Sequence, residues 1–337
     1  MDISTPSRIL ITGFSGFIGG YLVEQCRIAY PEARLFGVCR HSLLASASAP
    51  MKDITPFVAD ITNAEHMRHV VAETRPDLIF HLAAQSSVAA SWADPASALQ
   101  VNAGGAIHLL EAVRAERLSP RIVLVGSGEQ YGLVDPEENP IREETPLRPI
   151  NPYGVAKAAQ ELYGYQYFAA YGLPVLCVRQ FNSFGPRQNA AFVVANFAQQ
   201  IACIEAGKNE PVLTVGNLQA RRDFLPVVDV VRAYLAVARQ GQPGLAYNIG
   251  SGQAYAIGEI LDMLLARATA SIQVRADPTR QRPADVPLLV AGIARIQAHT
   301  GWEPLIEIKY ALEQTLNYWR ATVADKQYAV KSGFAAR

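Results

Sequence analysis

A glycine-rich loop directly after the first predicted strand constrains the fold of this 337-residue chain more than any other feature. The apolar run Arg8–Thr12 leads into Gly13, Gly16 and Gly19, and a segment of helical period, 17–30, follows at once. Glycines at this spacing permit a tight turn and let the backbone approach a pyrophosphate, which the free N–H groups and dipole of the following helix attract. The strand–loop–helix context predicts a dinucleotide site, and a glycine-rich turn without a ligand is the alternative.

Strand-like apolar runs alternate with helical segments over the first 180 residues. The strand runs are Arg8–Thr12, Arg34–Cys39, 56–59, 77–82, Arg121–Val125 and 174–179, and the helical segments are 17–30, 64–75, 96–117 and 153–172. Strands without polar alternation, separated by helices, indicate a parallel sheet that is covered on both faces. Because crossovers between parallel strands are right-handed, we expect an α/β fold with a Rossmann-type doubly wound parallel sheet.

Beyond residue 181 the elements become shorter, and prolines separate them. Helical patterns recur at 192–206, 227–239, 257–268 and 306–320, and the apolar run Ala246–Ile249 is expected to return to the first sheet. We therefore expect a Rossmann domain at 1–180 with a returning segment at about 223–250. A smaller, interleaved C-terminal substrate-binding lobe should comprise 181–222 and 251–323, followed by a tail at 324–337.

Charge and hydropathy exclude several classes of function. The chain has 30 basic and 30 acidic residues, so it lacks the basic balance of a nucleic-acid-binding protein. No apolar run approaches the roughly 18–20 residues that a membrane span needs. The four cysteines and the histidines show no metal-ligand spacing, so no metal site is expected. Residues 1–8 lack a signal-peptide pattern, and we expect a cytoplasmic protein.

The end of the second strand indicates which dinucleotide binds. An NAD-selective site usually places a carboxylate there for the ribose 2′-hydroxyl, whereas this chain has Arg40 and Ser42, which suit the 2′-phosphate of NADP. Arg40 as a solvated loop residue is the alternative. Asp60, after the third strand, either accepts a hydrogen bond from the adenine or caps the helix at 64–75. The expected cofactor contacts are Gly13, Ser15, Gly16, Phe17, Ile18, Gly19, Arg40, Ser42, Asp60, Ile61, Leu82, Ala83, Ala84, Gln85, Tyr153 and Lys157.

A tyrosine and a lysine four residues apart carry the chemistry. Tyr153 and Lys157 follow Pro152, which suits a first helical turn, so both side chains should share one helix face. A nearby ammonium is expected to lower the pKa of the phenol, which can then exchange a proton with an alcohol or ketone. Lysine is scarce, with six against 24 arginines, which makes this one worth noting. Ser127 and Glu129 stand just upstream. The alternatives are that Tyr153 and Lys157 form a surface pair and that Glu129 is a surface turn residue.

Together these motifs resemble an extended short-chain dehydrogenase/reductase, over about residues 8–320. Within that superfamily, stretches at 81–88, 126–132, 215–224 and 282–288 resemble the GDP-mannose 4,6-dehydratases. The related GDP-4-keto-6-deoxymannose reductases share much of this pattern and typically carry Asp where Glu129 stands.

The resemblance implies an NADP-dependent dehydration of GDP-mannose to GDP-4-keto-6-deoxymannose. Tyr153 would take the C4 hydroxyl proton as hydride leaves C4, Glu129 would take the C5 proton, water would leave C6, and the hydride would return there. These dehydratases usually have a hydroxyl or carboxylate residue where this chain has Gly128. Protonation of the leaving hydroxyl would then fall to Glu129, Tyr153 or water, or the protein does not eliminate water.

The sequence is also consistent with other functions. They are an NADPH-dependent reductase of the 4-keto sugar, another nucleotide-sugar dehydratase or epimerase, and a non-catalytic NADP-binding module. The complete set of Ser127, Tyr153 and Lys157 argues against the module, because binding alone has no use for an activated phenol.

The resemblance also assigns the substrate contacts and the assembly. A pyrophosphate needs guanidinium or amide donors, and several arginines lie at or near matched positions. The expected contacts are Ser87, Asn182, Arg187, Asn196, Val215, Asn217, Arg222, Arg282 and Asp285. The small and aromatic residues of 96–117 and 153–172 suggest pairing across a two-fold axis as a homodimer, or within a tetramer, with burial inside the monomer as the alternative.

Overall fold

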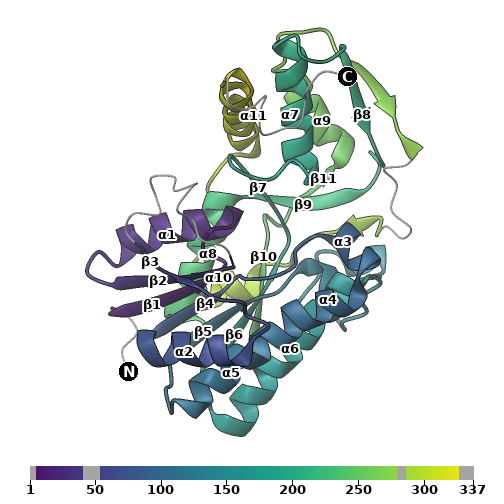
Figure 1. Cartoon of the computed structure of the whole chain (residues 1–337). Helices are drawn as coiled ribbons and strands as arrows, with labels where there is room; N and C mark the ends of the chain where they lie inside the picture. Colours follow the sequence, from purple (N-terminus) through teal and green to yellow (C-terminus); the bar gives the residue numbers. More distant parts are fainter. Residues whose placement is uncertain (1–4, 41–53, 279–285, 326–337) are drawn as a thin grey trace.

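The computed structural model describes residues 5–40, 54–278 and 286–325. Its main element is a parallel seven-stranded sheet in the order β10-β6-β5-β4-β1-β2-β3 (Figure 1). The strands are β1 (Arg8–Thr12), β2 (Arg34–Cys39), β3 (Ile54–Val58), β4 (Leu78–His81), β5 (Arg121–Val125), β6 (Val175–Gln180) and β10 (Ala246–Ile249). The expected doubly wound fold is confirmed, and Ala246–Ile249 does return to this sheet beside β6.

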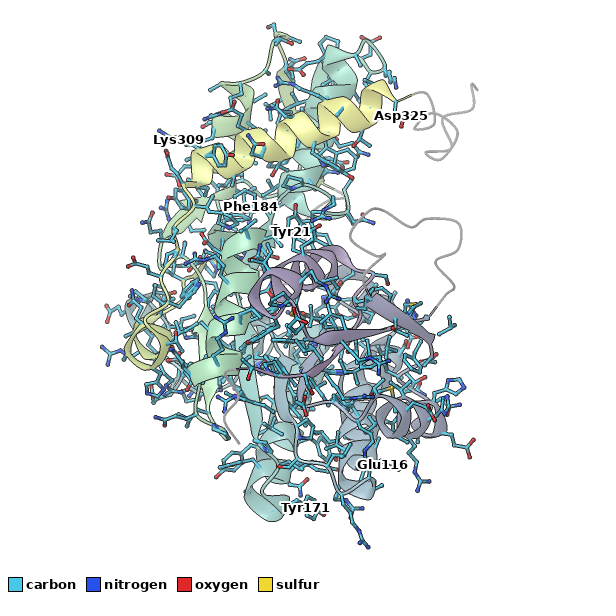
Figure 2. All side chains as sticks on the ribbon, turned by 90° about the vertical axis from the view of Figure 1, so that its left-hand side faces the viewer. Tyr21, Glu116, Tyr171, Phe184, Lys309 and Asp325 are labelled. Atoms are coloured by element: carbon cyan, nitrogen blue, oxygen red, sulfur yellow. The ribbon has the colours of Figure 1, made fainter. Side chains whose placement is uncertain are left out.

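Helices cover both faces of the sheet, as its uninterrupted apolar strands require. One layer consists of α1 (Phe17–Ala29), α8 (Val227–Gln240) and α10 (Ala294–Thr300), which share a core with β1, β4 and β6. The other consists of α2 (Ala64–Thr74), α5 (Gly105–Ala115) and α6 (Pro152–Tyr171). Figure 2 shows Glu116 and Tyr171, at the ends of α5 and α6, at the end of the molecule farthest from α11.

The second lobe has a core of its own. Helices α7 (Val193–Glu205), α9 (Ile257–Leu265) and α11 (Ile308–Ala324) pack together around Phe197, Leu264 and Leu316. Its strands are short: β7 (Asn182–Phe184), β9 (Arg221–Pro226), β11 (Ala254–Ala256) and β13 (Leu288–Leu289) form one sheet, and β8 (Val212–Val215) pairs with β12 (Gln273–Ala276). The sequence division places 251–323 in this lobe, yet α10 packs on α8 and β10 of the first sheet, where Ile296 is fully buried.

Asp223 of β9 ties the second lobe to the chain that leaves the first sheet. This fully buried carboxylate accepts hydrogen bonds from the Ser251 hydroxyl at 2.7 Å and from the backbone N–H groups of Ser251, Gly252 and Ala291 at 2.6–3.2 Å. Burial raises its pKa, against the opposing effect of those donors. These bonds hold β9 against the loop that follows the returning strand β10.

The predicted helix at 96–117 is interrupted. It consists of α4 (Pro95–Leu99), a π-helical turn at Gln100–Gly104, and α5. The wide turn places the fully buried Asn102 beside Gln85, where its Oδ1 accepts from the Gln85 N–H at 2.8 Å and its Nδ2 donates to the Gln85 carbonyl at 3.1 Å. Single π turns of this kind are frequent at functional sites.

None of the helices in the described ranges is long and apolar enough to cross a membrane. Within the same ranges, no group of three or more His, Cys, Asp or Glu side chains is arranged to hold a metal ion.

Candidate active site

The glycine loop forms a backbone cradle between β1 and α1. Gly13 has a left-handed φ of +72°, and a Cβ there would lie 2.8 Å from the N atom of Ala83, at the end of β4. A Cβ on Gly19 would lie 2.4 Å from the carbonyl oxygen of Gly13. Only glycine fits either position. The helix α1 begins at Phe17 with Gly16 as N-cap and no side-chain cap, so its first N–H groups face the loop. This cradle suits a dinucleotide pyrophosphate.

Arg40 and Asp60 lie near each other at the ends of β2 and β3. Arg40 is exposed, and Ser42 lies outside the described residues. Asp60 Oδ1 accepts from the backbone N–H and the hydroxyl of Thr62 at 2.9 and 2.8 Å. These two bonds lower the pKa of Asp60, and the charge of Arg40 lowers it further. The helix-cap alternative for Asp60 is wrong, because Asn63 caps α2.

The segment after β4 runs beside the glycine loop. The N–H groups of Leu82 and Ala83 donate to the backbone oxygen and the hydroxyl of Thr12 at 3.1 and 3.2 Å. Ala84 and Gln85 follow, with Gln85 held by Asn102. Ile61 is different, because its side chain is buried and packs against Gly105, where a Cβ would lie 2.6 Å from Ile61 Cδ1. A cofactor would therefore meet the backbone of Ile61.

Ser127 and Glu129 belong to a short loop at the end of β5. Ser127 caps the 3₁₀ turn Gly128–Gln130, and its Oγ accepts from the Glu129 N–H at 3.2 Å. Its hydroxyl also hydrogen-bonds the Tyr153 phenol. Glu129 is partly buried, and its Oε2 accepts from Asn151 Nδ2 at 2.8 Å. The structure thus brings the predicted serine, glutamate and tyrosine together.

The first turn of α6 presents Tyr153 and Lys157. Asn151 caps this helix by accepting from the Gly154 N–H at 2.8 Å, and Pro152 occupies its first turn. The Tyr153 N–H donates to Ser91 Oγ at 3.1 Å. Lys157 Nζ, which is almost fully buried, donates to the Val125 carbonyl at 2.7 Å and to Gln160 Oε1 at 2.9 Å.

The pKa values differ from the sequence expectation. Burial raises the pKa of Tyr153 to about 12, with the Ser127 hydrogen bond lowering it and the charge of Glu129 raising it. Burial lowers the pKa of Lys157 to about 7. The expected lowering of the phenol pKa by Lys157 is therefore wrong for this structure, because the ammonium points to Val125 and Gln160, and burial outweighs the remaining effects.

Several residues that shape the site belong to no sequence motif and were not predicted. Gln160 holds Lys157, Ser91 holds the Tyr153 backbone, and the fully buried Tyr234, which donates to Gln180 Oε1, lies close enough for Tyr153 to affect its pKa. Asn151 is recognisable in the sequence, since an Asn-Pro pair before a helical segment indicates an N-cap.

The predicted substrate contacts are more scattered than the catalytic groups. Arg187 forms an ion pair with Glu24 of α1, with an N···O distance of 2.8 Å, and stacks 3.8 Å above the centre of the Tyr21 ring. Asn182 begins β7, opposite Phe224 of β9. Ser87 caps helix α3 (Val88–Ala93) by accepting from the Ala90 N–H at 3.1 Å.

Four further substrate candidates lie within the second lobe. Arg222 is buried and donates to the Val286 and Arg221 carbonyls, and Val215 is a core residue. Asn196 Nδ2 donates to the Ala190 carbonyl at 3.0 Å, and the exposed Asn217 accepts from the Gln219 N–H at 2.9 Å. Arg282 and Asp285 lie outside the described residues.

Comparison with known proteins gives consistent matches over nearly the whole chain. The family model for GDP-mannose 4,6 dehydratase matches residues 10–315. The GDP-6-deoxy-D-mannose reductase of Pseudomonas aeruginosa is 36% identical, over 95% of this chain and 99% of the relative. A GDP-mannose 4,6-dehydratase of Yersinia enterocolitica is 29% identical, over 90% and 91%.

Solved structures agree with the sequence matches. RMD from Pseudomonas aeruginosa complexed with NADPH superposes with a TM-score of 0.80 at 33% identity, covering 93% of this chain and 99% of that one. UDP-glucose 4-epimerase from Thermotoga maritima with UDP-glucose gives 0.82 at 28%, covering 94% and 99%. The chain therefore belongs to the GDP-mannose 4,6-dehydratase family, a group of extended short-chain dehydrogenase/reductase enzymes that modify nucleotide sugars.

Proposed function

We propose that the protein reduces the 4-keto group of a GDP-4-keto-6-deoxyhexose with NADPH. The observation that carries this proposal is the environment of Gly128. A Cβ at this position would lie 3.2 Å from ring atoms of Phe181, so the loop between Ser127 and Glu129 has no acidic side chain and little room for one. Elimination of water needs a proton for the departing hydroxyl, whereas reduction of a ketone needs one only at the carbonyl oxygen.

The protonation state of Tyr153 supports reduction. With a pKa of about 12, the phenol carries its proton at neutral pH and can donate it to the oxygen that gains charge at C4. Ser127, which hydrogen-bonds the phenol, can contact the same oxygen. When bound, a reduced nicotinamide supplies the hydride. The cradle of Gly13, Gly16 and Gly19 would hold the pyrophosphate of that cofactor.

The comparisons also favour this reaction. The Pseudomonas relative named a GDP-6-deoxy-D-mannose reductase shares 36% identity with the chain, against 29% for the Yersinia dehydratase.

A second candidate is the 4,6-dehydration of GDP-mannose that the sequence predicts, and Glu129 favours it. Asn151 holds this carboxylate, and its charge is near enough to raise the pKa of Tyr153. A base beside the phenol is what removal of the C5 proton requires.

We further propose NADP rather than NAD as the cofactor. Arg40 is exposed at the end of β2, where a carboxylate would repel a 2′-phosphate, and the solved Pseudomonas relative was complexed with NADPH. We also propose that the second lobe binds the nucleotide sugar, through the substrate contacts that the sequence predicts.

We propose that two copies of the chain pair through α4 and α6, which lie side by side (Figure 1). The outer face of α6 exposes Leu162 and Tyr165, at 63% and 57%, and α4 adds Leu99 at 48%. Exposed apolar side chains gathered on neighbouring helices mark interaction surfaces. The α5 part of the predicted pairing segment contributes no exposed large apolar residue.

Cofactor stoichiometry tests the reaction. GDP-4-keto-6-deoxymannose should be reduced with loss of one equivalent of NADPH absorbance, and Tyr153→Phe should abolish this while still binding NADPH. GDP-mannose should not lose water. Conversion of GDP-mannose to the 4-keto sugar with catalytic NADP⁺ and no net change in NADPH would establish the second candidate instead.

Substitution of Arg40 tests the cofactor. Arg40→Ala should lower kcat/KM for NADPH by about tenfold to a hundredfold, because charge-assisted hydrogen bonds to the 2′-phosphate are lost, and should leave NADH kinetics unchanged. The matched control is Arg34→Ala, an exposed arginine at the other end of β2. An equal loss for both cofactors would contradict a role at the 2′-phosphate.

Light scattering tests the assembly. Leu162→Asp should convert a dimer into a monomer of unchanged circular dichroism, because it places a charge on the apolar face of α6. Ile28→Asp, at an even more exposed apolar position on α1, should remain dimeric. A monomeric wild-type protein would refute the proposal.

The buried lysine should make stability depend on pH. The pKa of Lys157 is about 7 in the folded chain, against 10.5 for an ordinary lysine, so between these values the unfolded chain binds more protons and the unfolding free energy rises with pH. Lys157→Met should therefore stabilise the fold most at pH 7 and below, with a gain that shrinks towards pH 10. Urea unfolding at several pH values would measure this, with the exposed Lys309→Met as control. Parallel pH profiles for wild type and Lys157→Met would contradict it.

A further inference from the structure

A buried glutamine joins the catalytic loop to the catalytic helix. Gln130 is fully buried, and its Oε1 accepts from the Ser127 N–H at 2.7 Å. Its Nε2 donates to Glu161 Oε2 at 2.8 Å. Glu161 lies on α6 one turn after Lys157, so this single side chain connects the serine to the helix that carries the tyrosine and the lysine.

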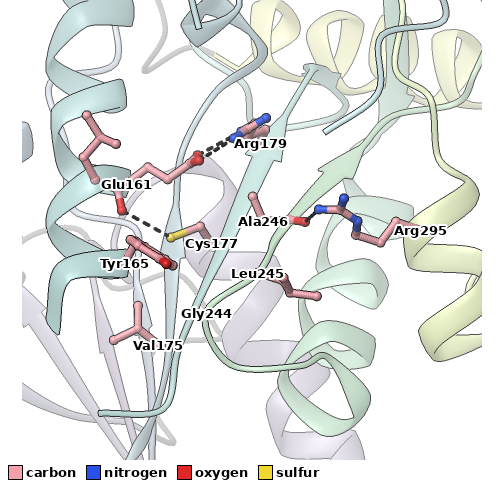
Figure 3. Close-up of a pocket in the computed structure, with 10 residues that line it drawn as sticks. Glu161, Tyr165, Val175, Cys177, Arg179, Gly244, Leu245, Ala246 and Arg295 are labelled. Atoms are coloured by element: carbon pink, nitrogen blue, oxygen red, sulfur yellow. Dashed lines mark hydrogen bonds and ion pairs between the residues drawn. The ribbon is translucent and has the colours of Figure 1, made fainter. Parts of the chain in front are cut away.

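The helix end of this connection is rigid. Glu161 forms an ion pair with Arg179 of β6 at 2.5 Å, with side-chain exposures of 12% and 7%. Figure 3 shows the two residues facing each other beside a cavity of about 230 Å³ at the β6–β10 edge of the sheet. Arg179 also donates to the Tyr131 hydroxyl and the Glu143 carbonyl, both at 2.8 Å. The carboxylate that Gln130 contacts is therefore fixed from the sheet.

The chemistry of position 130 is restrictive. Its side chain must accept a hydrogen bond from an N–H and donate one to a carboxylate, which an amide does and an aliphatic or ionised side chain does not. Gly126 provides the space, because a Cβ there would lie 2.3 Å from Gln130 Oε1. Asn151, which holds Glu129, is a separate connection between the loop and α6.

We propose that Gln130 is a positioning residue that aligns Ser127 with Tyr153 on one substrate oxygen. Without the amide, the Ser127 N–H loses its buried acceptor, and the serine hydroxyl loses its fixed place beside the phenol. A displacement of about 1 Å near reacting groups can cost as much as a hundredfold in rate. The inference rests on the proposed function only for the identity of that oxygen, a C4 carbonyl.

The decisive experiment is a double-mutant cycle on kcat. Gln130→Met should lower kcat at least about tenfold and leave KM for the sugar and NADPH within about twofold. In a Ser127→Ala background the same change should cost nothing further, because Gln130 acts through Ser127. Independent, multiplying losses would overturn the proposal.

The matched control is Tyr131→Phe. It removes two buried hydrogen bonds of the same network, to Arg179 and to Asn248, without touching those of Gln130. It should lower the Tm about as much as Gln130→Met does, but it should retain the kcat of the wild-type protein. An equal loss of kcat in Tyr131→Phe would mean that general loosening explains the effect, and would overturn the proposal.

Two further measurements cover other outcomes. If the wild-type protein does not oxidise NADPH with the 4-keto sugar, the proposed function fails, and hydrogen exchange decides about Gln130 alone. Gln130→Met should increase hydrogen exchange in the peptide around Ser127 and leave α6 protected, and unchanged protection would overturn the inference.

If the methionine variant does not fold, the near-isosteric Gln130→Glu takes its place. Its kcat should recover as the pH falls, because one of the two carboxyl groups at positions 130 and 161, which lie beside Arg179, takes up a proton and again donates a hydrogen bond to the other. A flat profile would contradict it.

Discussion

The site depends on how closely the loop after β5 docks against the chain around α6. A Cβ on Gly154 would lie 2.5 Å from the Glu129 carbonyl oxygen, and one on Gly132 only 1.8 Å from that of Arg148. Backbone therefore meets backbone at both ends of the loop, and no side chain can separate them. This backbone contact limits the distance between Ser127 and Tyr153, which are 26 residues apart in the sequence.

Burial then determines the electrostatics of the docked groups. Desolvation raises the pKa of Tyr153, so the phenol keeps its proton, and lowers the pKa of Lys157, so the ammonium gives up its proton more easily. In both groups burial disfavours the charged form. His81, fully buried on β4 and bonded to Thr12, is likewise kept neutral, with a pKa of about 3. Burial that makes charge on the phenol costly favours a reaction that delivers a proton to an oxygen at the moment charge appears there.

Local pattern was sufficient for the sheet and for the nucleotide end of the site. β1, the glycine loop and the start of α1 lie where the sequence predicts, and the strand β10 joins the sheet as expected, because each has a strong period or a required backbone conformation. Short strands such as β7 and β13 span two or three residues and have no period to detect. The direction of the Lys157 ammonium and the partner of Arg187 depend on contacts far away in sequence, so residue spacing alone could not give them.

The packing of Phe181 over Gly128 has a consequence for substitutions in the loop after β5. A new side chain at position 128 meets the aromatic ring at 3.2 Å, which is tighter than ordinary contact, so that ring must shift before the loop can accept it. Two substitutions are then coupled, and their order matters. A smaller residue in place of Phe181 would open room for a polar or acidic side chain at position 128. The neighbour of the loop, rather than the loop itself, therefore limits which side chains position 128 can carry.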